Sequence, residues 1–131
     1  MEKKAKTGKE MMTSLGKVLS DPQSQSFYQK YCEKFPALKI KIPFLTVNET
    51  LSHKPENYIG EIKVPVLILG SENDNVNSAQ ESRILFEKAN NPKEILMLDR
   101  AEHYECYEGD AFKKIVAKQI EWFNQYLKSN D

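Results

Sequence analysis

Two short apolar runs on either side of one helical segment constrain the fold of this chain most strongly. The runs cover residues 64–69 and 95–98, and the segment between them begins at the capping residue Ser78 and ends at the turn of residues 90–92. Nearly continuous apolar runs are typical of parallel strands that are covered on both faces. A strand, a helix and a second strand over this length predict a crossover connection, which makes the strands parallel. We therefore predict an α/β fold with a short parallel sheet flanked by helices.

One acid and one histidine follow the two predicted strands. Asp74 lies in the polar loop after the first strand, and His103 lies in the loop after the second. The carboxyl ends of parallel strands share one edge of the sheet, where α/β proteins bind ligands. A carboxylate there can orient a histidine ring for proton transfer. An Asp that bonds its own turn and a solvated loop His remain alternatives that these residues alone do not exclude.

The carboxyl-terminal segment predicts one more helix, from about residue 110 to residue 127. Apolar residues recur on it at helical spacing in two stripes, of which the second comprises Trp122 and Tyr126. The first stripe, which we expect to face the core, comprises Phe112, Val116, Ile120, Phe123 and Leu127.

Residues 1–52 predict a largely helical segment. Thr7 followed by Glu10 fits a capping box that opens a first helix, which we expect to run to about residue 19. Asp21 fits the N-cap of a second helix, with Pro22 at its first position. Alternating apolar residues at 38–42 then indicate a short edge strand or an extended connector, because Pro43 interrupts the alternation.

Composition excludes several classes of partner. Lys and Arg number 19, as do Asp and Glu, so the sequence offers no basic excess for nucleic acid. The longest apolar run is far shorter than the ~20 residues of a membrane-spanning helix, and no apolar stretch follows the charged amino terminus. Cys32 and Cys106 lie far apart without the spacing of a zinc site. We expect a cytoplasmic protein with no metal, cofactor, nucleic-acid or membrane partner.

Three stretches resemble the carboxyl-terminal part of α/β-hydrolases, closest to the serine esterases and peptidases related to dienelactone hydrolase and acylaminoacyl-peptidase. They are IKVPVLILGSENDNVNSAQES, PKEILMLDRAEHYECYE and FKKIVAKQIEWFNQYL. The resemblance covers roughly residues 55–127. It implies that Asp74 is the acid and His103 the base of a catalytic triad, in the family's order of nucleophile, acid and histidine. It also implies two parts: a cap-like helical segment over 1–52 and the carboxyl-terminal half of a hydrolase over 53–131.

The sequence departs from this family in three places. Ser71 and Glu102 stand where the family usually has glycine, and no G-x-S-x-G nucleophile elbow occurs in the chain. Cys106 is a candidate thiol nucleophile, although a half-buried loop cysteine is the simpler interpretation. We therefore predict that the chain does not turn over esters by itself.

Two functions remain open at this point. The chain is either the acid- and histidine-bearing part of a serine hydrolase of esters, thioesters or peptides, or a non-catalytic interaction module derived from that fold. In the first case the complete enzyme acts on a small-molecule or peptide acyl substrate. Half a sheet also leaves an unpaired edge and an apolar face, so we expect a homo-oligomer.

Overall fold

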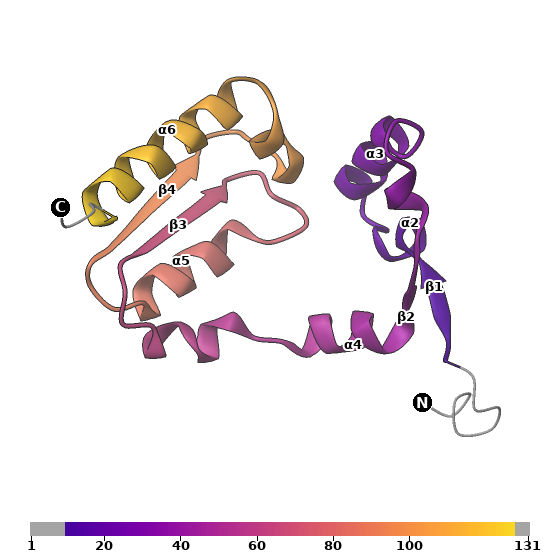
Figure 1. The fold of residues 1–131 in the computed structure, drawn as a ribbon, viewed down its shortest axis with the longest axis horizontal. Helices are drawn as coiled ribbons and strands as arrows, with labels where there is room; N and C mark the ends of the chain where they lie inside the picture. The colour runs from indigo at the N-terminus through magenta and orange to yellow at the C-terminus, as the bar shows by residue number, and fades with distance from the viewer. Residues whose placement is uncertain (1–9, 128–131) are drawn as a thin grey trace. The chain divides into compact units, whose positions relative to one another are not determined.

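The computed structural model describes residues 10–127 and divides the chain into two compact units, Met1–His53 and Lys54–Asp131. Figure 1 traces both units as a ribbon. The capping box predicted at Thr7 lies outside the described residues. Each unit is built around one two-stranded sheet, antiparallel in the first unit and parallel in the second.

The first unit pairs strand β1 (Met12–Ser14) with strand β2 (Lys41–Pro43) in antiparallel register. The described part of this unit also contains the helical elements α2 (Leu15–Val18), α3 (Pro22–Tyr31), η1 (Pro36–Lys39) and α4 (Phe44–Ser52).

Two features of this unit can be compared with the sequence. The second helix is confirmed: the Asp21 carboxylate accepts a hydrogen bond from the backbone N–H of Ser24 at 2.8 Å, and Pro22 is the first residue of α3. The predicted first helix is confirmed over Leu15–Val18, which form α2, and is wrong over Met12–Ser14, which form strand β1. Backbone pairing with residues almost 30 positions away along the chain overrides the local apolar spacing there.

The second unit is a parallel pair of strands with a helix on each side. Strand β3 (Val66–Ser71) pairs with strand β4 (Lys93–Leu98), in a register that matches Val66 with Lys93 and Ser71 with Leu98. Helices α5 (Ala79–Lys88) and α6 (Gly109–Tyr126) flank the strands in Figure 1. Three short helical turns complete the unit: η2 (Pro55–Asn57), η3 (Ile59–Glu61) and η4 (His103–Tyr107).

The predicted strand–helix–strand unit is therefore confirmed, with parallel strands. Ser78 is the N-cap of α5, and its hydroxyl accepts a hydrogen bond from the backbone N–H of Gln80 at 3.1 Å. The first strand begins later than its apolar run, because Val64 lies outside β3 with 65% of its surface exposed.

The expected core face of the last helix is wrong. Trp122, in the stripe placed second, is 7% exposed, whereas Ile120 and Phe123 of the longer stripe are each 54% exposed. Helix α6 carries apolar residues on two neighbouring faces, and the face that holds Trp122 is the more deeply buried one. The core also includes Ile68 of β3 and Leu98 of β4, both of which are buried.

Candidate active site

The loop after β3 fixes the Asp74 carboxylate from its own backbone. Oδ1 accepts hydrogen bonds from the N–H groups of Val76 at 2.8 Å and Asn77 at 2.7 Å. This turn, in which an Asp side chain bonds backbone groups just ahead of it, is a common use of the residue. It also leaves Oδ2 to face away from the turn. The side chain is 11% exposed, so the carboxylate is largely shielded from water.

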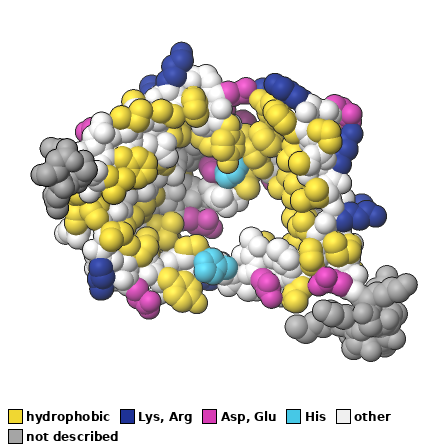
Figure 2. Space-filling model, in the orientation of Figure 1, with side chains coloured by type: hydrophobic (Ala, Val, Ile, Leu, Met, Phe, Trp, Pro, Cys, Tyr) yellow, Lys and Arg dark blue, Asp and Glu magenta, His cyan; other side chains and the backbone are white. Residues whose placement is uncertain are grey.

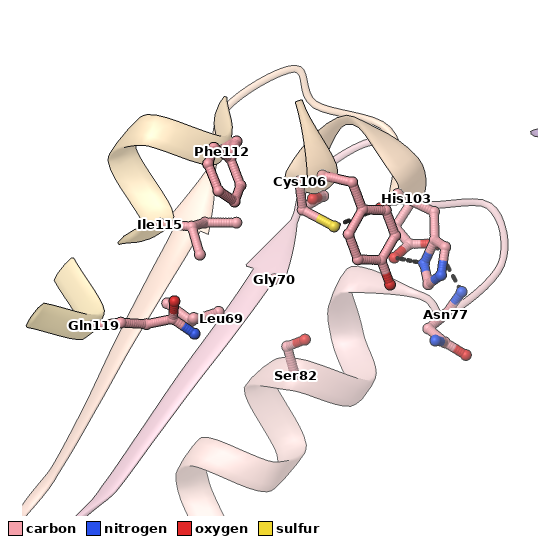
Figure 3. A pocket seen from close by; sticks show the side chains of 12 residues that line it. Leu69, Gly70, Asn77, Ser82, His103, Cys106, Phe112, Ile115 and Gln119 are labelled. Atoms are coloured by element: carbon pink, nitrogen blue, oxygen red, sulfur yellow. Dashed lines mark hydrogen bonds and ion pairs between the residues drawn. The ribbon is translucent and has the colours of Figure 1, made fainter. Parts of the chain in front are cut away.

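His103, the first residue of η4, meets that second oxygen. Its Nδ1 lies 2.7 Å from Asp74 Oδ2, with the imidazole side chain 21% exposed (Figure 3). An ionised carboxylate only accepts hydrogen bonds, so the geometry selects the tautomer with a proton on Nδ1. The ring of Tyr104 packs edge-on against the imidazole with 4.6 Å between centroids. The structure thus brings the two predicted site residues into direct contact.

Backbone contacts join the two loops that carry this pair. The N–H of Asn73 donates to the carbonyl of Ala101 at 3.0 Å, and the Asn73 side-chain amide donates to the carbonyl of Arg100 at 3.1 Å. One residue immediately before the acid therefore holds the segment that leads to His103. Asn73 was not predicted from the sequence, because an Asn in a polar loop gives no signal of its partner.

A capping box stabilises the turn that begins at His103. The Glu105 carboxylate accepts from the backbone N–H of Glu102 at 2.7 Å, and the Glu102 side chain accepts from the Glu105 N–H in return. Glu102, a departure from the family pattern, thus has a structural function at this position.

A cavity of about 420 Å³ opens beside the acid and the histidine. Figure 3 shows Leu69 and Gly70 of β3 in its wall, with Ser82 of α5 on one side and Ile115 of α6 on another. The exposed area of its walls is mostly apolar, and its polar groups lie both at the end that holds His103 and farther along, at Ser82 and Gln119 (Figure 3). The hydrogen-bonded pair of Asp74 and His103 thus lies in the wall of a largely apolar pocket.

Two curated proteins match most of this chain. The chain is 41% identical over 127 residues, 96% of its length, to an uncharacterized 31.7 kDa protein from the traX-finO intergenic region of Escherichia coli, of which it covers 44%. It is 29% identical over 88% of its length to a monoglyceride lipase homolog of Monkeypox virus, of which it also covers 44%. No family model matches the chain.

One solved structure identifies the fold of this chain. The monoacylglycerol lipase of Paleococcus ferrophilus superposes with a TM-score of 0.67 over 95% of this chain and 50% of that one, at 20% identity. The chain has the fold of the carboxyl-terminal part of an α/β-hydrolase. It spans about half the length of the proteins that it matches.

Within this α/β-hydrolase part, the cysteine and serines near the acid are poor nucleophiles. The Cys106 thiol donates to the carbonyl of His103 at 3.1 Å, and burial raises the pKa of that thiol, which disfavours the reactive thiolate. Ser71 is buried within β3, and the Ser78 hydroxyl caps α5. None of the three stands on a strand-to-helix elbow.

Two further classes of site can be addressed for residues 10–127. Among them, no group of three or more His, Cys, Asp or Glu side chains is arranged to hold a metal ion. No helix within this range is long and apolar enough to cross a membrane.

Proposed function

We propose that this chain supplies the acid and the histidine of a serine-type acyl hydrolase. The hydrogen bond between Asp74 Oδ2 and His103 Nδ1, at 2.7 Å beside an apolar pocket, carries the proposal. Because Nδ1 faces the carboxylate, proton exchange with the reacting groups falls to Nε2. The fold supports the same interpretation, since the acid and the histidine follow successive parallel strands in the order typical of α/β-hydrolases.

The proposed reaction has two stages. A serine hydroxyl transfers its proton to His103 Nε2 as its oxygen attacks the acyl carbonyl, and Asp74 stabilises the resulting imidazolium. The imidazolium then protonates the departing alkoxide, which leaves an acyl-serine ester. Water repeats the sequence: His103 takes its proton, the acyl group leaves as a carboxylic acid, and the serine recovers its hydrogen.

In this proposal, the serine and the oxyanion hole come from polypeptide other than residues 1–131. The chain holds no G-x-S-x-G motif, and the proteins that it matches are about twice as long. Without a serine on such an elbow, the Asp74–His103 pair has no hydroxyl placed for attack on an acyl group. We infer that the chain by itself does not hydrolyse esters.

Carboxylic esters are the favoured substrate class. Two of the matched proteins are described as a monoacylglycerol lipase and a monoglyceride lipase homolog. The apolar walls contributed by Leu69 and Ile115 suit an acyl chain better than a polar peptide. Residues 1–53 form a separate compact unit, in keeping with the cap segment expected from the sequence.

A chimera tests this function. In the chimera, this chain replaces the matched region of the 31.7 kDa Escherichia coli relative. Hydrolysis of p-nitrophenyl acetate and of a monoacylglycerol is then measured for both the relative and the chimera. We expect both to hydrolyse esters, with His103→Ala and Asp74→Asn chimeras losing about 10³-fold or more in kcat. An active relative with an inactive chimera, or no loss in the His103→Ala chimera, overturns the assignment. If neither protein hydrolyses either ester, the non-catalytic interaction module is favoured.

A further inference from the structure

The loop that carries Asp74 begins on one element and ends on another. We call this segment, residues 72–78, the acid loop: it follows the last residue of β3 and ends at Ser78, the N-cap of α5. At its start, the backbone N–H of Glu72 donates to the carbonyl of Leu98 at 3.0 Å, which extends the ladder with β4 past the end of β3. The position of Asp74 therefore depends on how β3 and α5 are held together.

One ion pair joins the start of the acid loop to the helix that follows it. Arg83, in the second turn of α5, donates from Nη2 to both carboxylate oxygens of Glu72, at 2.6 and 2.7 Å. Charge-assisted bonds to both oxygens restrict the direction of the carboxylate as well as its distance. The pair thus ties the point where the chain leaves β3 to the body of α5.

The exposure of this pair argues against a mainly stabilising role. The side chains of Arg83 and Glu72 are 41% and 34% exposed. Ion pairs this open to water contribute little to the free energy of folding, because solvent screens their charges. Figure 2 shows Lys, Arg, Asp and Glu side chains spread over the face that it draws, so charge alone does not distinguish this pair. Its place in the chain does, since Glu72 stands two positions before Asp74.

The Asp74 carboxylate takes its orientation from the later part of the acid loop. Oδ1 accepts from the N–H groups of Val76 and Asn77, which leaves Oδ2 to meet His103 Nδ1 at 2.7 Å. A shift of α5 relative to β3 would move Val76 and Asn77 away from the end of the strand, and the Asp74 side chain would turn with them. Because hydrogen bonds weaken steeply as their geometry degrades, a small shift of this kind weakens the contact with His103.

We propose that the Glu72–Arg83 ion pair positions the Asp74 carboxylate for His103 by holding the acid loop between β3 and α5. This proposal rests on the function proposed above, to which it adds two positioning residues. The residues that line the cavity do not include Glu72 or Arg83, so the pair acts through Asp74 and not on the substrate. Its loss should lower kcat with little change in KM, because Asp74 stabilises the imidazolium that forms during the reaction.

Amide exchange in the chain of residues 1–131 gives the first test. Arg83→Gln and Glu72→Gln each remove the ion pair, and the N–H groups of Val76 and Asn77 should then exchange with water at least threefold faster by NMR. The double variant should exchange no faster than either single variant, since both changes break one contact. Lys113→Gln, which removes an exposed ion pair within α6, is the control and should change these rates less than twofold. Unchanged exchange in Arg83→Gln, or additive effects in the double variant, overturns the proposal.

The chimera described above gives the second test. Arg83→Gln should lower kcat at least fivefold and leave KM within twofold, with the same urea midpoint as Lys113→Gln. Arg83→Lys, which keeps the charge, should recover part of the lost kcat. An unchanged kcat, or a fall in kcat that accompanies a lower urea midpoint, overturns the positioning role. An inactive chimera without these substitutions counts against the hydrolase alone, because amide exchange in the chain still decides whether the ion pair holds Asp74.

Discussion

The backbone N–H of Asn73 donates to the carbonyl of Ala101 at 3.0 Å and so joins the loop of the acid to the loop of the histidine. The side-chain amide of Asn73 adds a second bond to the same segment, at the carbonyl of Arg100. Arg100 itself has a φ of 58°, a left-handed conformation that costs a non-glycine residue free energy unless its surroundings hold it. These contacts lie immediately before Asp74 and His103, which makes Asn73 a positioning residue for the pair.

We predict that Asn73→Ala loosens the contact between Asp74 and His103. The substitution keeps the backbone bond to Ala101 but removes the bond to Arg100, so the histidine loop gains freedom. In ¹⁵N spectra of neutral His103, the share of the tautomer protonated on Nε2 should rise, with Asn124→Ala as a control that leaves it unchanged. A tautomer ratio like that of the unsubstituted protein would show that Asn73 serves the fold without positioning the ring.

The two apolar faces of α6 should differ sharply in their effect on stability. Trp122 is buried, so Trp122→Ala should cost about 3–5 kcal/mol of the free energy of unfolding. Ile120→Ala, on the exposed face, should cost less than about 1 kcal/mol in the chain alone. Urea unfolding followed by circular dichroism measures both. If Ile120→Ala cost more free energy of unfolding than Trp122→Ala, the face of α6 that holds Ile120 and Phe123 would be the one that packs in the core.

A side chain at Gly70 is predicted to displace the side chains of Ser82 and Met97. A Cβ added there would lie 2.7 Å from Ser82 Oγ and 2.9 Å from the Met97 Cε and Sδ atoms. Because these contacts are far below van der Waals distance, Gly70→Ala should destabilise the second unit by about 1–3 kcal/mol. Gly60→Ala, whose Cβ would meet only an ordinary contact at 3.4 Å, is the matched control. Equal unfolding midpoints for the two variants would contradict the packing described at β3.

The Cys106 thiol should react only at elevated pH. Burial raises its pKa, so the thiolate appears above the usual range of about 8.5, and alkylation accelerates there. The pH dependence of iodoacetamide labelling at Cys106, read by peptide mass spectrometry in the native chain and in urea, checks this. If labelling of Cys106 accelerates at the same pH in the native chain and in urea, its thiol pKa is not raised by folding. The raised pKa would then no longer argue against Cys106 as a nucleophile.

Local sequence signals predicted the parts of the fold that depend on neighbours in the chain. Ser78 caps α5, and the two apolar runs form the parallel pair β3 and β4, which brings Asp74 to His103. These features follow from capping chemistry and from the direction of a strand–helix–strand crossover.

Features that depend on distant partners could not be predicted in the same way. Met12–Ser14 is a strand because it pairs with Lys41–Pro43, and the residues of the segment itself give no sequence signal of that pairing. The buried face of α6 depends on how many strands lie beneath the helix, whereas the helix itself carries two apolar faces. The contacts of Asn73 with the histidine loop belong to the same class, since they join residues 27 or more positions apart.

The protonation of the His103 ring tests the central claim most directly. A two-bond ¹H–¹⁵N spectrum of the chain above the titration of its histidines distinguishes the tautomers of His103 from those of His53, with His103→Ala for assignment. We predict that neutral His103 carries its proton on Nδ1, facing Asp74, and that Asp74→Asn shifts it toward Nε2. A proton held mainly on Nε2 in the unsubstituted chain, unchanged by Asp74→Asn, would contradict the charge-relay pair on which the proposed hydrolase rests.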